Sequence, residues 1–363
     1  MTVRNVARKA GVSPASVSLA LNGHPRVSPE MAEKVLTAAR ELGYSKKGRR
    51  TKSAPGIHTG YIGLLCVGLP AWSWRLPFFV NFVHSLESQL ASHGLQMVLN
   101  QVPDPQVLPK NICARRMDGA FLIGSLHGPG TLAGLEELPT VRVFGCPQPG
   151  IDWVTTNASE HGRLAGEYLL GRGHQRLAFL NPDRVHEVFP EYGRSFQQTV
   201  AAQGVEALML VEQQVYSDRS LWTREHYKKV TEKLLQAYFS LPAQERPTGM
   251  YVANDEVSLV AYQVLAENGV QPGVDLEIIS NDNEEPFLSL LTPRPATIEP
   301  DYEEIARLSL DRLLYRLQHP AAPIGLQLLV PPHLISPTGH TRSDAHSPNK
   351  STTPVASDPL SSE

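Results

Sequence analysis

Basic side chains gather at the start of the chain, where they could bind phosphate. Residues 1–52 hold 11 Lys or Arg against 3 Asp or Glu, a net charge of +8, while the remaining residues have a net charge of −11. A concentrated positive field attracts a nucleic-acid backbone, because each neutralised phosphate releases counterions. The same side chains could instead form a solvated, solubilising face, so charge by itself leaves both interpretations open.

Aromatic side chains follow the first apolar run of the remaining chain. Trp72, Trp74 and Phe78 are candidates for stacking on a sugar or a purine, because binding pockets combine aromatic walls with a few polar groups. Phe79 falls in a helical apolar stripe, so a core position is the better interpretation for it.

Polar side chains follow two of the later apolar runs. Asp282 comes just after Leu276–Ile279, and open α/β lobes bind ligands at the carboxyl ends of their strands. Asp282 could accept a hydrogen bond from a ligand hydroxyl or cap the next helix, and both interpretations stay open. For Asn254, capping of the following helix is preferred over ligand contact.

Sequence patterns typical of enzymes are missing. The chain has no HExxH, no phosphate loop ending in Gly-Lys-Ser/Thr, no GxGxxG and no GxSxG. Its three cysteines, Cys66, Cys113 and Cys146, contain no CxxC pair and cannot form a disulfide framework. We therefore expect no catalytic residues, no cofactor and no metal.

The apolar runs are too short for a membrane span. The longest, Ile62–Leu69, is far below the roughly 20 residues needed to cross a bilayer. Charged residues in Met1–Lys9 stand where a secretory signal would need its apolar core. These features predict a soluble, cytoplasmic protein with no membrane partner.

Three short helices are predicted in the first 44 residues. Apolar residues recur at helical spacing in Val3–Ala10 and in the segments after Ser13 and Ser28. Gly11 is expected to end the first helix, and Ser13 and Ser28 to cap the next two. This is the pattern of a helix-turn-helix with a supporting helix.

The later chain has a different pattern. Beyond a basic linker at 46–58, apolar runs alternate with helices, which indicates parallel sheets covered on both faces. The fold class is therefore α/β, with an all-α domain at 1–45 followed by a two-lobed parallel-sheet domain at 59–335. Residues 336–363 are rich in Ser, Thr and Pro and are predicted to be a disordered tail.

These motifs together resemble a known family. An ungapped pattern resembles the DNA-binding domain of the LacI/GalR bacterial transcription repressors, in Val6–Gly23, Val27-Ser28 and Leu42-Gly43-Tyr44. Further motifs resemble that family's regulatory domain, which is similar to type I periplasmic binding proteins: Met117–Gly119, Gly171–Arg176, Ala253–Asp255 and Ser280–Asn283. The resemblance implies lobe 1 at about 59–172 and 288–316, and lobe 2 at about 173–287 and 317–335.

The resemblance also implies a function. It implies a homodimeric transcription repressor that binds a double-stranded DNA operator and whose operator affinity is controlled by a small effector between the lobes. The aromatic segment favours a sugar as that effector. The alternative is a solute-binding protein for sugar transport or sensing, without DNA regulation.

Residues that would contact DNA follow from the same resemblance, together with the basic linker. They are Thr2, Ser13, Pro14, Ala15, Ser16, Ser18, Leu19, Asn22, Arg26, Ser28, Tyr44, Lys46, Lys47, Arg49 and Arg50. For Ser13 and Ser28, capping and phosphate contact can hold together, because a helix amino terminus faces phosphate well. For the basic residues, the alternative is a solvated tail.

The sequence departs from the family where the family reads DNA. Pro14, Ala15 and Leu19 occupy positions that usually face base edges, and none has a side-chain hydrogen-bonding group. Specificity would then rest on apolar contacts, neighbouring hydroxyls and DNA shape. The linker also lacks the leucine that the family inserts into the minor groove.

The ligand site also differs from the family pattern. Tyr192 stands where the family usually has an arginine that reaches the ligand, so a neutral ligand is favoured over a charged one. His161 and Tyr216 are added by resemblance to positions lining the cleft. The full set of ligand candidates is Trp72, Trp74, Phe78, His161, Tyr192, Tyr216, Asn254 and Asp282.

Overall fold

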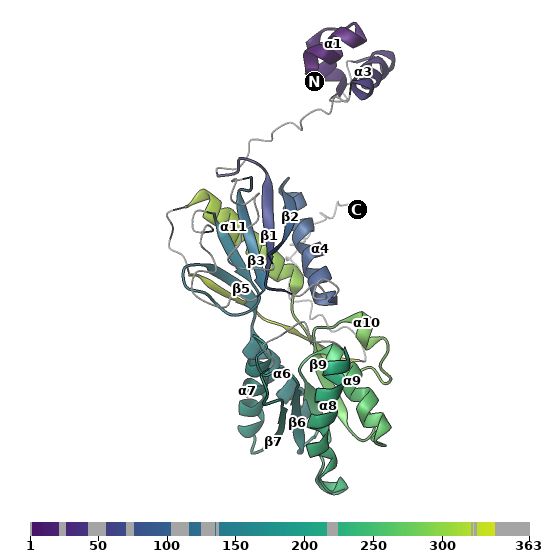
Figure 1. The fold of residues 1–363 in the computed structure, drawn as a ribbon, viewed down its shortest axis with the longest axis vertical. Coiled ribbons are helices and arrows are strands. Elements are labelled where there is room, and N and C mark those ends of the chain that lie inside the picture. Colours follow the sequence, from purple (N-terminus) through teal and green to yellow (C-terminus); the bar gives the residue numbers. More distant parts are fainter. Residues whose placement is uncertain are drawn as a thin grey trace, which may run out of the picture. The chain divides into compact units, whose positions relative to one another are not determined.

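The computed structural model describes residues 2–21, 27–42, 56–69, 76–102, 116–124, 135, 138–215, 224–320, 322 and 325–337. The chain divides into two compact units, Met1–Pro55 and Gly56–Glu363 (Figure 1). The predicted tail lies outside the described residues from 338 onward, and the predicted linker lies outside them up to residue 55.

The first unit is a three-helix domain. Its helices are α1 (Val3–Ala10), α2 (Pro14–Leu21) and α3 (Pro29–Glu41). Each helix contributes one completely buried valine to a common core, namely Val6, Val17 and Val35. The helix-turn-helix with a supporting helix predicted from apolar spacing is confirmed.

The second unit contains two lobes, each built on a six-stranded sheet. The lobe 1 sheet is parallel throughout and has the strand order β11-β5-β4-β3-β1-β2. Its strands are β1 (Tyr61–Val67), β2 (Gln96–Val102), β3 (Gly119–Gly124), β4 (Thr140–Val143), β5 (Asp152–Thr156) and β11 (Gln327–Val330). Helices α4 (Pro77–Ser92) and α11 (Tyr302–Gln318) pack on one face of this sheet, where Phe82, Leu86 and Leu313 are completely buried.

The lobe 2 sheet has the order β12-β10-β9-β8-β6-β7, and only the β10–β12 pair is antiparallel among these described strands. Its strands are β6 (Leu177–Asn181), β7 (Ala207–Val211), β8 (Gly249–Val252), β9 (Glu277–Asn281), β10 (Ala296–Glu299) and β12 (His333–Ile335). Its helices are α6 (Ala158–Gly171), α7 (Phe189–Ala201), α8 (Arg224–Phe239), α9 (Asp255–Glu267) and α10 (Glu285–Leu288), with a 3-10 turn at Ala243–Glu245. Helix α6 lies beside α7, and α8 beside α9 (Figure 1). Each pair shares an apolar cluster. The predicted α/β class with parallel sheets is confirmed.

The lobe boundaries differ from those predicted. Residues 158–172 form α6 and its end, which pack on α7 and on strands of lobe 2 rather than in lobe 1. Strand β10 belongs to lobe 2, and β11 belongs to lobe 1, the reverse of the predicted assignment for 296–299 and 327–330. The chain therefore crosses between the lobes three times, at Asn157, at Pro300-Asp301 and at Pro331-Pro332. A sequence without pairing information cannot show which sheet a short strand joins.

Two of the motifs that carry the family resemblance have structural roles. The Asp118 carboxylate accepts hydrogen bonds of 2.7–3.0 Å from the backbone N–H groups of His58, Thr59 and Gly60, which fixes the chain as it enters β1. In the Gly171–Arg176 motif, His174 Nε2 lies 2.8 Å from the Glu277 carboxylate at the start of β9. These contacts hold loops against the sheets.

Candidate nucleic-acid interface and ligand cleft

Helix α2 begins from a tight turn that the sequence encodes directly. Gly11 has φ = 67°, a left-handed conformation that glycine adopts without strain, and its N–H bonds to the Ala7 carbonyl. The Ser13 hydroxyl then accepts a hydrogen bond of 3.1 Å from the Ser16 N–H, which confirms Ser13 as the N-cap of α2. The turn fixes the direction in which α2 leaves α1.

The outward face of α2 is apolar and hydroxylic rather than charged. Val17 and Ala20 are buried, whereas Pro14, Ala15 and Leu19 are exposed. Leu19 is 39% exposed, so its side chain is available for contact. The structure thus brings together the three residues whose positions face base edges in the family. Ser18 shares this exposed face and Ser16 is half-buried beside it.

Two further predicted DNA contacts lie at helix starts. Ser28 caps α3 by accepting a hydrogen bond of 3.3 Å from the Met31 N–H, and Thr2 is the exposed residue before α1. The remaining predicted contacts lie outside the described residues: Asn22, Arg26, Tyr44, Lys46, Lys47, Arg49 and Arg50.

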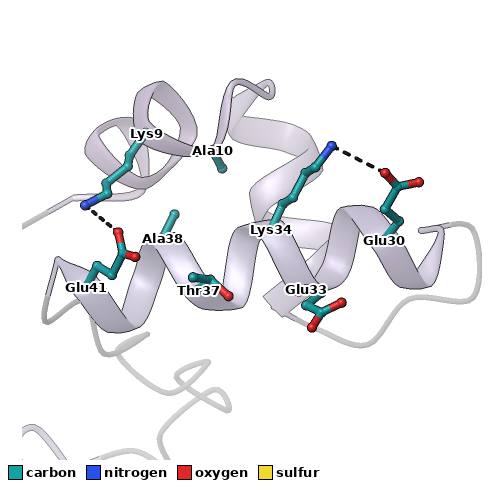
Figure 2. A pocket seen from close by; sticks show the side chains of 8 residues that line it. All are labelled: Lys9, Ala10, Glu30, Glu33, Lys34, Thr37, Ala38 and Glu41. Atoms are coloured by element: carbon teal, nitrogen blue, oxygen red, sulfur yellow. Dashed lines mark ion pairs between the residues drawn. The ribbon is translucent and has the colours of Figure 1, made fainter.

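A groove in this domain lies between α1 and α3 and contains no residue of α2 (Figure 2). Four of its charged side chains form two pairs: Lys9 Nζ lies 2.6 Å from the Glu41 carboxylate, and Lys34 Nζ lies 3.5 Å from that of Glu30. Exposed pairs of this kind stabilise a fold by about 0 to 1 kcal/mol. The groove therefore joins two helices and is separate from the exposed face of α2.

The second unit contains a cavity of about 220 Å³ between its lobes. The cavity lies where strands of both lobes end. In lobe 1, Leu69 follows β1, Phe144 follows β4 and Thr156 ends β5. In lobe 2, Asn254 follows β8 and Asp282 follows β9. Carboxyl ends of parallel strands are the usual place for a ligand in such lobes.

Aromatic rings form much of the cavity wall. In lobe 1, Phe144 packs edge-on against Phe78 and Tyr302, with ring centroids 6.2 Å from each. In lobe 2, Phe189 lies with its centroid 5.9 Å from that of Tyr192. A small molecule between the lobes would meet rings on both sides.

Three carboxyl groups lie close together on the lobe 2 side. Glu284 and Asp282 line the cavity, and Asp255 is completely buried behind them. Burial, reinforced by the Asp255 charge, raises the pKa of Glu284 to about 8. Burial and the charges of Glu284 and Asp255 likewise raise the pKa of Asp282 well above its usual range. Asp282 also has φ = 96°, a conformation that non-glycine residues adopt at a cost and that recurs at binding sites.

The three carboxyl groups differ in their partners. Asp255 accepts hydrogen bonds from the Ser280 hydroxyl, from the Glu284 N–H at 2.7 Å and from the Thr297 hydroxyl at 3.1 Å. Even so, burial raises the pKa of Asp255 to about 7. Glu284 accepts one hydrogen bond of 3.0 Å, from the Phe78 N–H at the start of α4 in lobe 1.

A second contact joins the lobes beside the cavity. Arg142 on β4 is 2% exposed and donates to the Gly124 carbonyl at 3.0 Å and to the Glu187 carboxylate of lobe 2 at 3.3 Å. Gly145 has φ = 65°, and a Cβ there would displace the Glu187 carboxylate from this contact. Two interlobe contacts therefore flank the cavity, one through Glu187 and one through Glu284.

Four of the predicted ligand residues line the cavity, namely Phe78, Tyr192, Asn254 and Asp282. Asn254 also caps α9 by accepting a hydrogen bond of 2.9 Å from the Val257 N–H, as its position predicts. Trp72, Trp74 and Tyr216 lie outside the described residues.

The structure gives His161 a different place from the one predicted. It does not line the cavity but is completely buried, with its ring nitrogens 2.8 Å from Thr156 Oγ1 and 2.8 Å from Asn281 Oδ1. Burial lowers the pKa of His161 to about 4, so the ring is neutral at physiological pH. It supports Tyr192, whose ring stacks on it with centroids 4.6 Å apart.

Several residues that line the cavity are not among the predicted ligand residues. Glu284 could have been noticed because it stands two residues after Asp282. Phe144, Phe189 and Tyr302 carry no such signal, since each looks like an ordinary core residue. Thr155 also carries no signal in the sequence; its hydroxyl is buried and has no hydrogen-bond partner among the residues that the structure describes.

Within the described residues, no helix is long and apolar enough to cross a membrane, and no group of three or more His, Cys, Asp or Glu could hold a metal ion.

A helix-turn-helix domain followed by a two-lobed sheet domain with an interlobe cavity defines a DNA-binding regulator. Comparisons with known proteins agree. The family of bacterial regulatory proteins described as lacI matches residues 2–47, and the periplasmic binding protein-like domain matches residues 167–336. The chain belongs to the lacI family and is a DNA-binding transcriptional repressor of that family.

Individual relatives are distant but span nearly the whole chain. The HTH-type transcriptional repressor PurR of Mannheimia succiniciproducens is 25% identical over 333 residues, covering 88% of this chain and 92% of that protein. A solved complex of the transcriptional regulator CelR with cellobiose has a TM-score of 0.62 at 22% identity and covers 93% of this chain and 100% of that chain. The lac repressor dimer bound to operator and the anti-inducer ONPF has a TM-score of 0.66 at 23% identity, covering 93% and 98%. At this identity the solved structures establish the fold alone.

Proposed function

We propose that this repressor binds a pseudo-palindromic operator as a homodimer and that a sugar in the interlobe cavity controls its operator affinity. The observation that carries the proposal is the cavity itself. It combines aromatic walls from both lobes with the carboxyl group of Asp282, at the strand ends where such lobes bind ligands.

Several features favour a sugar. Rings such as Phe144 and Tyr192 offer flat apolar faces, while Asp282 and Thr155 offer hydrogen-bonding groups. No Lys or Arg is among the described residues that line the cavity, so a phosphate or carboxylate group would find no cationic partner there. The complex of CelR with cellobiose adds a precedent on the same fold.

DNA recognition is proposed for the exposed face of α2. One helix-turn-helix contacts only a few base pairs, so two copies on adjacent half-sites are needed for useful specificity. Pro14, Ala15 and Leu19 would make apolar contacts such as those to thymine methyl groups. The predicted contacts of the linker, among them Lys46 and Arg49, would bind phosphates. The solute-binding alternative offers no use for this domain.

Selection of duplexes from a random pool by the full-length chain tests the DNA half of the proposal. We expect an enriched site with two related half-sites, and weaker discrimination by Leu19→Ala, by about 1 kcal/mol. Leu36→Ala is the matched control, because Leu36 is an exposed leucine on α3 rather than on α2. Enrichment of no sequence over random DNA at physiological salt would refute this part.

A further inference from the structure

The carboxyl groups on the lobe 2 side of the cavity have hydrogen-bonding capacity that the described residues leave unused. Glu284 is 2% exposed and has one oxygen bonded to the Phe78 N–H, with no other side-chain hydrogen bond to a described residue. Asp282 makes no side-chain hydrogen bond to any described residue. Asp255 is fully engaged with Ser280, Thr297 and the Glu284 backbone. Two of the three groups therefore keep acceptor capacity toward the cavity.

Two described guanidinium groups lie in this region, and neither has a hydrogen bond to Asp282 or Glu284. Arg294 donates to the Glu285 carboxylate at 2.7 Å and to Asn283 Oδ1 at 3.4 Å. Arg142 is directed to the Gly124 carbonyl and to Glu187, on the other flank of the cavity. Carboxyl groups buried without a counterion favour their protonated form, and a ligand cation is the group that would favour the ionised form.

Two further features of the cavity suit a cationic ligand. Thr155 is 2% exposed and lines the cavity, and its hydroxyl has no partner among the described residues, so a ligand N–H or O–H could satisfy it. The rings of Phe144, Tyr302 and Tyr192 provide faces on which a cation is favourable.

We propose that the effector carries a protonated amine, as in an amino sugar, and that its ammonium group binds between Asp282 and Glu284. This rests on the proposed function, since it assigns the chemical class of the same effector. It replaces the neutral ligand favoured by sequence, which followed from the loss of one arginine and took no account of Glu284.

Binding of the ammonium group requires Asp282 and Glu284 to be ionised, so protons held by the pair in the empty cavity pass to the buffer. Other titratable or charged groups face the same region. They are Asp255, Glu256, Glu187, His186, Tyr192, Tyr251, Tyr302, Arg142 and Arg294.

Calorimetry on the full-length chain with matched sugar pairs tests the proposal: glucosamine against glucose, and galactosamine against galactose. Tetramethylammonium against tert-butanol adds a pair that depends on no sugar scaffold. We expect the cation of at least one sugar pair to bind at least tenfold more tightly, and tetramethylammonium to raise the Tm above the value with tert-butanol. The proposal is overturned if every cation binds no more tightly than its neutral counterpart. That result would mean either that another protein cation neutralises the carboxyl groups or that the cavity does not accept amines.

Two variants localise the effect. Asp282→Asn and Glu284→Gln should each reduce the preference for the cation at least fivefold, and Gln retains an acceptor for the Phe78 N–H. Glu245→Gln, at an exposed glutamate of lobe 2, should keep the full preference. An unchanged preference in both cavity variants overturns the assignment.

A measurement on the unmodified chain tests the proposal without relying on the folding of a variant. Titrations of the tighter cation in buffers of different ionisation enthalpy should report net proton release, and no release contradicts the proposal. The proposed function fails in a different way, namely if no sugar of any charge alters operator affinity. If neutral sugars shift operator affinity and the protein shows no preference for amines, the proposed function is upheld and the proposed ammonium site is refuted.

Discussion

Glu284 is a buried carboxyl group whose pKa of about 8 makes folding depend on pH. Its ordinary pKa is 4.5, so between these values the folded chain holds a proton that the unfolded chain has released. Stability conferred by this proton is fully present at the acidic end and is lost as pH rises through about 8. Asp255, with a pKa raised to about 7, acts in the same direction.

At the residue scale we therefore predict that the free energy of unfolding falls by about 1 to 3 kcal/mol between pH 5.5 and pH 8.5. Glu284→Gln should flatten that dependence, because the amide cannot titrate. Urea unfolding across the pH range measures it, with Glu245→Gln as the exposed control. A dependence that is equally steep in Glu284→Gln would show that other groups control it.

Some of the cavity residues could be predicted from the sequence and others could not. Asp282 and Asn254 could be predicted because their positions after apolar runs place them at strand ends. The interlobe contact of Glu284 could not, because its partner Phe78 lies 206 positions away in the chain. Resemblance to the family predicts His161 in the cleft, whereas in the structure it is buried and contacts Thr156 of β5 and Asn281 of β9.

At the element scale, serine caps set the starts of two helices in the DNA-binding domain. We predict that Ser28→Ala destabilises α3 by about 1 kcal/mol, since the Met31 N–H loses its acceptor. Ser28→Asp should keep the cap but weaken DNA binding if Ser28 also faces phosphate. Amide hydrogen exchange of α3 without DNA, and anisotropy with DNA, separate the two roles. Unaltered exchange in Ser28→Ala would contradict the capping role.

The elements themselves were only partly predictable. Uninterrupted apolar runs gave β1, β6 and β9, because these strands lie inside parallel sheets. Strands β7 and β11 lie at sheet edges, where half-exposed residues interrupt the apolar pattern. The assignment of β10 and β11 to the opposite lobes depends on long-range pairing that local patterns do not contain.

At the scale of the whole molecule, charge is divided between a positive N-terminal segment and a negative body. We predict that operator affinity falls steeply with salt, because phosphate neutralisation by the segment of net charge +8 releases counterions. Replacing Lys46, Lys47, Arg49 and Arg50 by alanine should weaken binding to all sequences about equally and reduce the slope of log K against log salt. Titrations at several salt concentrations measure both. A slope that does not change would exclude these residues as phosphate contacts.

The three chain crossings join the two lobes that would hold the proposed effector between them. A ligand that contacts both lobes favours the arrangement in which Glu187 and Glu284 reach lobe 1, because it bridges the same gap. By linkage, any effect of the ligand on DNA affinity equals the effect of DNA on ligand affinity.

Control of operator affinity by a sugar is tested most directly by fluorescence anisotropy, which measures operator affinity of the full-length chain with each sugar of the panel present or absent. We predict that at least one sugar shifts the operator Kd by about fivefold or more, within the usual range of allosteric coupling. We also predict that Asp282→Asn abolishes the shift while operator binding without sugar stays unchanged. Operator affinity that is insensitive to every sugar the chain binds, or a full shift in Asp282→Asn, would contradict the proposed control by a sugar.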